Sequence, residues 1–158
     1  MTDTPLIRPP RREDHDQWRA LWHAYNVFYG RDWGTGGEPP VEPEVTAATW
    51  GRFFDAYEPL WALVAEGADG KLLGFTHYLF HRNTNQIQPV CYLEDLFTAE
   101  TARGRGVGRA LIEGVCDAAK AAGLPKVYWL TQEGNATARR LYDQVAEKSD
   151  FVVYGKEL

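Results

Sequence analysis

The sequence has few of the features that mark export, membrane insertion or nucleic-acid binding. Only two of its 158 residues are cysteine, Cys91 and Cys116, and both lie in expected core elements, which favours reduced thiols in a cytoplasmic protein. The chain carries 17 lysine and arginine residues against 22 aspartate and glutamate residues, so it lacks the basic footprint of general nucleic-acid binding. No apolar run has the length of a membrane span, and the first residues lack the basic and apolar segments of a signal peptide.

The remaining composition is that of a folded protein, with 44% hydrophobic and 25% charged residues. At this length we expect one domain over residues 1–158. Residues 30–44 hold many glycines and prolines, which predicts a long loop. Hydrophobic spacing predicts strands at residues 6–8, 60–66, 72–80, 90–97, 126–131 and 151–154. It predicts helices at residues 14–29, 46–57, 107–122 and from 135 onward, with Asp14, Thr46 and Asn135 at the starts of three of them.

Antiparallel hairpins in the first half of the chain and a β-α-β crossover in the second predict a mixed α/β fold. The crossover begins with a strand, a turn of glycines and arginines and a helix N-terminus, all within residues 92–112. The first N–H groups of a helix have no partner within it, and the helix dipole favours an anion there. Glycines let an anion approach the backbone, and arginines suit phosphate oxygens. The turn therefore predicts a phosphate site, although it has neither a dinucleotide G-x-G-x-x-G nor a P-loop motif.

The residues of this turn carry a family resemblance. Arg103-Gly104-Arg105-Gly106-Val107-Gly108 matches the Arg/Gln-x-x-Gly-x-Gly/Ala signature of the GCN5-related N-acetyltransferases (GNAT). Asn135-x-x-Ala138-x-x-x-Tyr142 matches the second landmark of that family, and the order of elements is similar over nearly the whole chain. The string Tyr-Leu-Glu-Asp-Leu-Phe at residues 92–97 resembles the diamine and polyamine acetyltransferases. Residues 127–142 resemble the yeast histone and polyamine acetyltransferases.

The resemblance implies a GNAT-like fold, in which helices flank a mostly antiparallel twisted sheet with one splayed parallel strand pair. It implies acetyl-CoA as cosubstrate, lying where the strands of residues 93–98 and 127–131 diverge. The pantetheine arm would pair with the main chain of Leu96, Phe97 and Thr98. The pyrophosphate would sit on Arg103, Gly104, Arg105, Gly106, Val107, Gly108 and Arg109. Asn135 would hold the pantetheine or the substrate side of the cleft, Ala138 would pack against the cofactor, and Tyr142 would stand near the thioester sulfur.

Acetyl transfer to an amine needs a base, because an alkylamine with a pKa of ~10 is mostly protonated at neutral pH. Neighbouring strand residues point to opposite faces, so we expect only one of Glu94 and Asp95 to face the amine. The similarity to polyamine enzymes favours Glu94 as the base and leaves Asp95 as a structural salt-bridge partner. The residues alone leave Glu94, Asp95 and a water chain open. Tyr142 is the candidate acid for the departing thiolate.

Neither a metal site nor a covalent nucleophile is expected. His77 and His81 share one face of a strand but have no evident third ligand. Cys91 has no evident histidine partner, so we expect a packed thiol. We therefore predict a homodimeric N-acetyltransferase that uses acetyl-CoA to acetylate a small amine, such as a polyamine, an amino acid or a related metabolite, with neither nucleic acid nor membrane as a partner. The alternatives are a protein lysine or N-terminal acetyltransferase and a non-catalytic sensor of acetyl-CoA.

Overall fold

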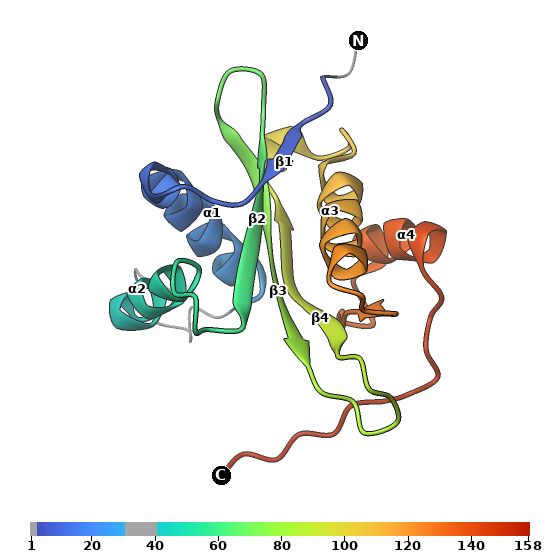
Figure 1. Ribbon diagram of the computed structural model, residues 1–158. Helices are drawn as coiled ribbons and strands as arrows, with labels where there is room; N and C mark the ends of the chain where they lie inside the picture. Colours follow the sequence, from blue (N-terminus) through green and yellow to red (C-terminus); the bar gives the residue numbers. More distant parts are fainter. Residues whose placement is uncertain (1–2, 31–40) are drawn as a thin grey trace.

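A twisted five-stranded sheet runs through the molecule, for which a computed structural model describes residues 3–30 and 41–158 (Figure 1). The strands lie in the order β1 (Leu6–Arg8), β2 (Leu60–Glu66), β3 (Leu72–His81), β4 (Val90–Thr98) and β5 (Val127–Tyr128). Strands β1 to β4 pair antiparallel, and β5 joins β4 in parallel. The predicted mixed α/β class is confirmed, whereas the extent of the single domain, residues 1–158, stays a prediction.

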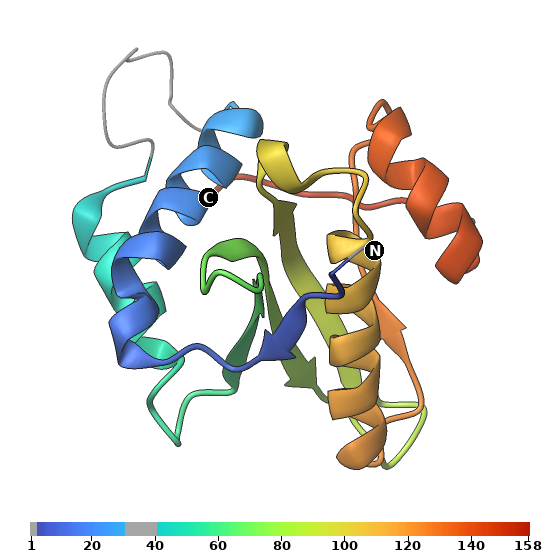
Figure 2. The same ribbon diagram turned by 90° about the horizontal axis from the view of Figure 1, so that it is seen from above.

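Helices cover both faces of the sheet (Figures 1 and 2). Helices α1 (His15–Phe28) and α2 (Pro43–Arg52) lie on one face, and α3 (Val107–Ala121) and α4 (Ala136–Val145) lie on the other. Two short 3-10 turns, η1 (Arg12–Asp14) and η2 (Glu100–Ala102), precede α1 and α3. No helix in the described ranges is both long and apolar enough to cross a membrane.

Each face of the sheet buries its own hydrophobic cluster. The cluster under α1 and α2, here the α1-face cluster, consists of Trp18, Tyr25, Trp50, Val64, Leu72, Phe75 and Phe97. Aromatic residues at helical spacing on α1 supply much of it. The cluster under α3, here the α3-face cluster, consists of Leu63, Ala65, Tyr78, Cys91, Leu93, Ala102, Val107, Leu111, Ile112, Val115, Ala119 and Leu124. The sheet is therefore buried on both sides.

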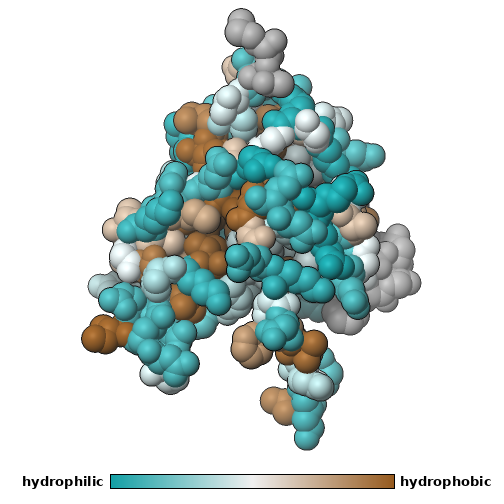
Figure 3. Space-filling model, turned by 90° about the vertical axis from the view of Figure 1, so that its right-hand side faces the viewer, coloured by the Kyte–Doolittle hydropathy of each residue, from teal (hydrophilic) through white to brown (hydrophobic). Residues whose placement is uncertain are grey.

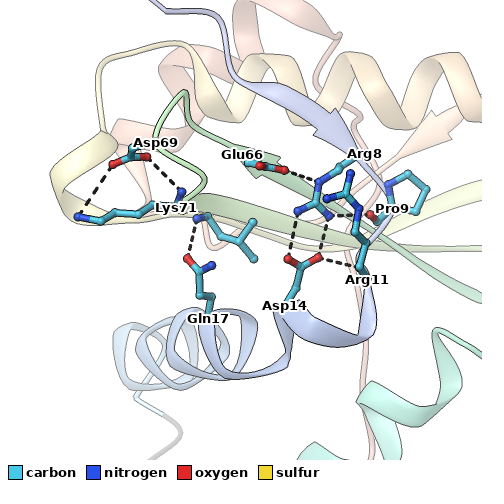
Figure 4. A network of polar contacts seen from close by, with 9 residues as sticks. Arg8, Pro9, Arg11, Asp14, Gln17, Glu66, Asp69 and Lys71 are labelled. Atoms are coloured by element: carbon cyan, nitrogen blue, oxygen red, sulfur yellow. Dashed lines mark hydrogen bonds and ion pairs between the residues drawn. The ribbon is translucent and has the colours of Figure 1, made fainter.

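An ion-pair network fastens the N-terminal strand and α1 to the sheet (Figure 4). Nη1 and Nη2 of Arg8 donate to the two carboxylate oxygens of Asp14 at 2.7 and 3.1 Å, and Nε of Arg8 donates to Glu66. Asp14 stands at the start of α1 as expected, but its carboxylate does not cap that helix. It accepts instead from Arg8 and from the main-chain N–H of Arg11 at 2.7 Å. Asp14, expected as a helix cap, instead forms an ion pair with Arg8 that links α1 to β1, and Arg8 links both to β2 through Glu66.

The start and end of α2 differ from the sequence prediction. The helix begins at Pro43, three residues before Thr46, because proline suits the first position of a helix. Thr46 therefore lies inside the helix, where its hydroxyl accepts from the indole of Trp22 at 3.2 Å. The helix ends at Arg52, and Tyr57, the last residue of the expected helix, is 97% exposed. Most of the loop expected at residues 30–44 falls at 31–40, outside the described residues.

The C-terminal strand expected at residues 151–154 is wrong. Residues 146–158 form neither helix nor strand, and the segment projects from the body of the molecule (Figures 1 and 3). Phe151, Val152, Val153 and Tyr154 have strand-forming side chains, yet they are between 72% and 92% exposed. β-Propensity needs a neighbouring strand to pair with, and no strand of the described residues pairs with this segment. β5 is likewise shorter than the expected strand at residues 126–131.

Candidate active site

The parallel strands β4 and β5 separate after two residue pairs. Their pairing ends at Tyr92 and Tyr128, but β4 continues to Thr98 with β3 along its other edge. From Leu93 onward, no strand of the described residues pairs with the outer edge of β4. The predicted splayed strand pair is therefore present. Such an edge can bind an extended molecule through main-chain hydrogen bonds, as in the addition of a peptide strand.

The turn between η2 and α3 has the backbone geometry of an anion site. Gly104 and Gly106 have φ of 76° and 77°, in the left-handed region that favours glycine. A Cβ at either position would have no heavy atom within 4 Å, so the backbone there borders open space. Gly106 is the N-cap of α3, and the first N–H groups of that helix point out of its N-terminus. The turn therefore presents donors and the positive end of the helix dipole to an anion.

The arginines of the turn lie around the start of α3. Arg103 and Arg105 are exposed, and Arg109 is half-buried. The guanidinium carbon of Arg103 lies 5.6 Å from the centre of the Phe28 ring, at the end of α1. Arg109 donates from Nη2 to the side-chain oxygen of Gln144 on α4. The turn thus lies between α1 and α4, with three cations near the N-terminus of α3.

Gly108, in the first turn of α3, has a packing role that the sequence interpretation missed. A Cβ at this position would lie 3.3 Å from Cδ2 of Leu141 and 3.8 Å from Oγ1 of Thr98. A glycine here lets α3 approach α4 and the end of β4 closely. From the sequence, phosphate access was the only reason inferred for a glycine at position 108. The close contact with Leu141 supplies a second reason.

Asn135, the expected landmark residue, is the N-cap of α4 (Ala136–Val145). Oδ1 of Asn135 accepts from the N–H of Ala138 at 3.4 Å, and Nδ2 of Asn135 donates to the Thr131 hydroxyl at 3.4 Å. The three-residue spacing of Asn135 and Ala138 is that of an N-cap and its partner. The side chain therefore orients the start of α4, while its contact with pantetheine stays a prediction. The same holds for the packing of Ala138 against the cofactor.

Tyr142 follows Ala138 by one turn of α4. Its ring packs edge-on against Trp129, with 5.5 Å between the ring centres. Burial raises the pKa of Tyr142 to about 12, and the neighbouring Tyr29 adds to the increase. The hydroxyl is therefore protonated throughout the physiological range and is available as a hydrogen-bond donor.

A β-bulge in β4 contains one of the two adjacent carboxylates. In the pairing with β3, His77 lies opposite Asp95 whereas Tyr78 lies opposite Leu93. Two neighbouring residues of β3 therefore face three successive residues of β4, and Glu94 is the extra one.

The bulge changes which residues of β4 face which helices. Leu93 packs in the α3-face cluster and Phe97 in the α1-face cluster, although residues four apart on an unbroken strand share one face. The strict alternation that the sequence interpretation assumed for Glu94 and Asp95 therefore does not hold here. Glu94 is exposed, and the carboxylate of Asp95 turns toward α1.

Asp95 is held by side chains on both sides. The Tyr25 hydroxyl donates to Oδ1 of Asp95 at 2.6 Å, and Nδ1 of His77 lies 2.9 Å from Oδ2. Sequence reasoning expected a structural partner for Asp95 but did not identify these two. Only the register of β3 with β4, bulge included, brings His77 opposite Asp95.

Two other groups considered from the sequence lie outside this arrangement. Burial raises the pKa of the Cys91 thiol to about 12, which keeps it protonated and unsuited to nucleophilic attack. The imidazole of His81 contacts the Tyr128 hydroxyl at 2.7 Å. Among the described residues, no three His, Cys, Asp or Glu side chains lie close enough together to hold a metal ion.

Comparison with known proteins identifies the family. The model of the acetyltransferase (GNAT) family matches residues 16–146 of the chain. The D-amino-acid N-acetyltransferase HPA3 of Saccharomyces cerevisiae is 37% identical over 155 residues, which cover 98% of this chain and 91% of the yeast protein. The chain belongs to the GNAT family. The predicted resemblance and the predicted class of enzyme, an N-acetyltransferase, are thereby confirmed.

A second curated protein and two solved structures also resemble the chain. An aminoglycoside N(6')-acetyltransferase type 1 of Serratia marcescens is 32% identical over 102 residues, covering 61% of this chain and 70% of that protein. The structure of AAC(6')-Iy with a CoA bisubstrate analogue has a TM-score of 0.78 at 22% identity and covers 98% of both chains. A transcriptional regulator from Bacillus halodurans has a TM-score of 0.80 at 20% identity, over 98% of this chain and 99% of the other. These two structures confirm the predicted fold.

The residues of this GNAT chain fit coenzyme A. The glycine turn offers open backbone and three arginines to a pyrophosphate, and the edge of β4 with which no described strand pairs after Tyr92 offers main-chain groups to an extended arm. The two features adjoin, because β4 ends at Thr98 and η2 leads from it into the turn. AAC(6')-Iy, which resembles this chain at 22% identity with a TM-score of 0.78, was solved in complex with CoA.

Proposed function

We propose that this acetyltransferase transfers the acetyl group of acetyl-CoA to the primary amine of a small molecule, and that a D-amino acid is its acceptor. The observation that carries the proposal is the 37% identity to the yeast D-amino-acid N-acetyltransferase across 98% of the chain. The relative from Serratia is also named for a small-molecule amine, an aminoglycoside. A polyamine or a related metabolite is the next acceptor class, from the likeness of residues 92–97 to polyamine enzymes.

The cosubstrate is proposed to lie along β4 and the glycine turn. The main chain of Leu96, Phe97 and Thr98 pairs with the pantetheine arm, and residues 103–109 hold the pyrophosphate. The left-handed glycines support this placement, as does the edge of β4, with which no described strand pairs after Tyr92. Asn135 and its α4 neighbour Ala138 border the same cleft. Acetyl-CoA, when bound, supplies the acetyl group as a reactive thioester.

Two side chains are proposed to serve the chemistry. Glu94, exposed on the bulge of β4, accepts a proton from the acceptor ammonium and so supplies the neutral amine that attacks the thioester. Tyr142 donates a hydrogen bond from its protonated hydroxyl to the departing thiolate. Direct attack by the amine requires no covalent enzyme intermediate. Glu94 and Tyr142 come from different elements, β4 and α4.

An acceptor panel with detection of free CoA tests the proposal. The panel contains D- and L-forms of several amino acids, spermidine and spermine, an aminoglycoside and a lysine-containing peptide. We expect turnover with small amines and a preference for the D-form within each amino-acid pair. A variant with both Arg103 and Arg105 changed to glutamate serves as the control without cosubstrate binding. Turnover of the peptide alone would indicate a protein acetyltransferase, and no turnover with any acceptor would indicate a sensor of acetyl-CoA.

We also infer a homodimer located in the cytoplasm. The exposed apolar side chains of residues 151–154 form a surface of the kind that proteins bury on association. Both cysteines are free thiols, which accords with a reducing compartment. Sedimentation velocity measures the assembly state, and a monomer at micromolar concentration would contradict the dimer. Fractionation of the source cells tests the compartment.

A further inference from the structure

Hydrogen bonds link α1 to the bulge of β4 through one buried chain of side chains. Nε1 of Trp18 donates to Nε2 of His77 at 3.1 Å, and Nδ1 of His77 lies 2.9 Å from Oδ2 of Asp95. The Tyr25 hydroxyl donates to Oδ1 of the same carboxylate at 2.6 Å. Trp18 is fully buried, and the side chains of His77 and Asp95 are only 2% and 12% exposed. These hydrogen bonds therefore connect residues of α1, β3 and β4.

The contact with Trp18 determines the tautomer of His77. An indole nitrogen can only donate, so Nε2 of His77 accepts and carries no proton. The proton of the neutral imidazole is then on Nδ1, which donates to Asp95. Asp95 therefore accepts a hydrogen bond on each carboxylate oxygen, one from His77 and one from Tyr25. Both oxygens are fixed in orientation.

Aromatic rings hold the imidazole of His77 in place. The Phe75 ring stacks on it with 4.6 Å between ring centres, and the Phe53 ring lies 4.8 Å away. Trp22 approaches to 5.4 Å from α1. Reorientation of the imidazole would displace these packed rings, so the donor to Asp95 is rigid.

The main chain of Asp95 is held as well. The Thr76 hydroxyl donates to the carbonyl oxygen of Asp95 at 2.8 Å. After the bulge, residues 96–98 pair with β3, and before it, residues 90–93 pair with β3 and partly with β5. Within β4, which is described in full, Glu94 is the residue outside the register, and the residue after it is fixed through side chain and main chain.

We propose that the hydrogen-bonded side chains of Trp18, His77, Tyr25 and Asp95 form a positioning network for Glu94. The network fixes the orientation of Asp95, and Asp95 in turn stabilises the β-bulge from which Glu94 meets the acceptor amine. Trp18, His77 and Tyr25 act through Asp95 and do not touch the substrate. The inference rests on the proposed role of Glu94 as the base. Because residues 96–98 are secured separately by β3, loosening the network disturbs Glu94 more than it disturbs the stretch proposed to bind pantetheine.

Two substitutions of His77 separate its two hydrogen bonds. In His77→Asn, the amide nitrogen replaces Nδ1 and keeps a donor for Asp95, but nothing accepts from Trp18. In His77→Gln, the longer side chain reaches the position of Nε2 and keeps an acceptor for Trp18, but the donor to Asp95 is lost. Both side chains are neutral amides, so each variant is the matched control of the other.

The proposed network predicts that, of the two variants, His77→Asn has the higher kcat and His77→Gln has the higher melting temperature. His77→Gln is expected to lower kcat by about 10- to 100-fold with acetyl-CoA affinity retained, because a small misplacement of a reacting group has effects of this size. His77→Asn is expected to stay close to the wild-type kcat. It is nevertheless expected to melt at the lower temperature, since it leaves the fully buried indole N–H of Trp18 without an acceptor. The partly exposed Asp95 can accept from water instead.

A double-mutant cycle tests whether His77 acts through Glu94. Residues that act as one unit show non-additive effects, so His77→Gln combined with Glu94→Gln is expected to have a kcat within about twofold of that of Glu94→Gln alone. Tyr25→Phe, which removes the other donor to Asp95, is expected to behave like His77→Gln in the same cycle. Steady-state kinetics, calorimetry with acetyl-CoA and thermal melts of all variants complete the measurement.

Three results would overturn the inference. They are a wild-type rate in Glu94→Gln, additive losses in the double variant, and rates that follow stability so that His77→Asn is the slower of the pair. Failure of the proposed function has a different signature, namely no acetylation of any amine in the panel by the wild-type protein.

Discussion

Replacing Tyr142 by phenylalanine is expected to slow acetyl transfer by about 10- to 150-fold while leaving acetyl-CoA affinity unchanged. The substitution removes one hydroxyl and keeps the ring that packs edge-on against Trp129. Helix α4 therefore keeps its packing, and a loss of rate reports on the hydroxyl alone.

The magnitude follows from the buried environment of Tyr142, which raises its pKa to about 12. A thiol has a pKa of ~8.5, about 3.5 below the pKa of Tyr142. Full proton transfer from Tyr142 to a thiolate is therefore unfavourable by roughly 5 kcal/mol. The hydroxyl therefore acts as a hydrogen-bond donor to the developing negative charge. Such a bond contributes about 1.5–3 kcal/mol, which corresponds to the stated range of rates.

The assay is steady-state kcat at saturating substrates between pH 6 and pH 10, with calorimetry of acetyl-CoA binding as the control. Because the pKa of Tyr142 is about 12, the wild-type rate should not decline through its ionisation within this range. An unchanged kcat in Tyr142→Phe would show that the hydroxyl is not at the thiolate. A decline of the wild-type rate near pH 9 that disappears in the variant would show that the hydroxyl ionises far below the stated pKa.

Three further variants test the glycine turn and the ion pair between Arg8 and Asp14. Changing Arg103 and Arg105 together to glutamate should abolish acetyl-CoA binding in calorimetry, because it places negative charge at the start of α3; undiminished affinity would remove the turn from the site. Gly106→Ala should cost about 1–2 kcal/mol in urea unfolding, since alanine is strained at a φ of 77°, and a neutral result would mean that the turn relaxes. Asp14→Asn should cost about 3 kcal/mol, because its ion pair with Arg8 is largely buried. The Arg8 guanidinium lowers the pKa of Asp14 on folding, so this contribution is complete above about pH 4 and is lost as the pH falls through the folded-state pKa. The difference in melting temperature between wild type and Asp14→Asn should therefore shrink in acid, and a constant difference from pH 7 to pH 3 would contradict the ion pair as its source.

The sequence predicted those elements whose signals are local. Helix α3 has a continuous apolar face and a glycine at its end, and it appears within one residue of the expected bounds. The apolar run at residues 151–154 was mistaken for a strand because its partner is not encoded locally. Helix α2 shows the same limit, since Thr46 looked like a cap while Pro43 offered an earlier start.

In the candidate site, too, the features with local sequence signals could be predicted and those that depend on distant residues could not. The glycine turn could be predicted because helix N-termini and left-handed glycines follow from short spacings. The surroundings of Asp95 could not, because Tyr25 lies 70 residues away in the chain and His77 lies 18 away. A single extra residue at Glu94 decides which side chains meet, and residue preferences carry no information on register.

The open edge of β4 has a consequence for the lifetime of the protein. An unpaired strand edge invites pairing with other chains, which is the first step of aggregation. A cosubstrate that lies along this edge covers it, and at 100 times its Kd it would add about 2.7 kcal/mol to the stability of the folded chain. Cells depleted of acetyl-CoA would then lose the enzyme itself sooner, through unfolding and degradation. Metabolic supply would in this way set the abundance of the catalyst as well as the rate of its reaction.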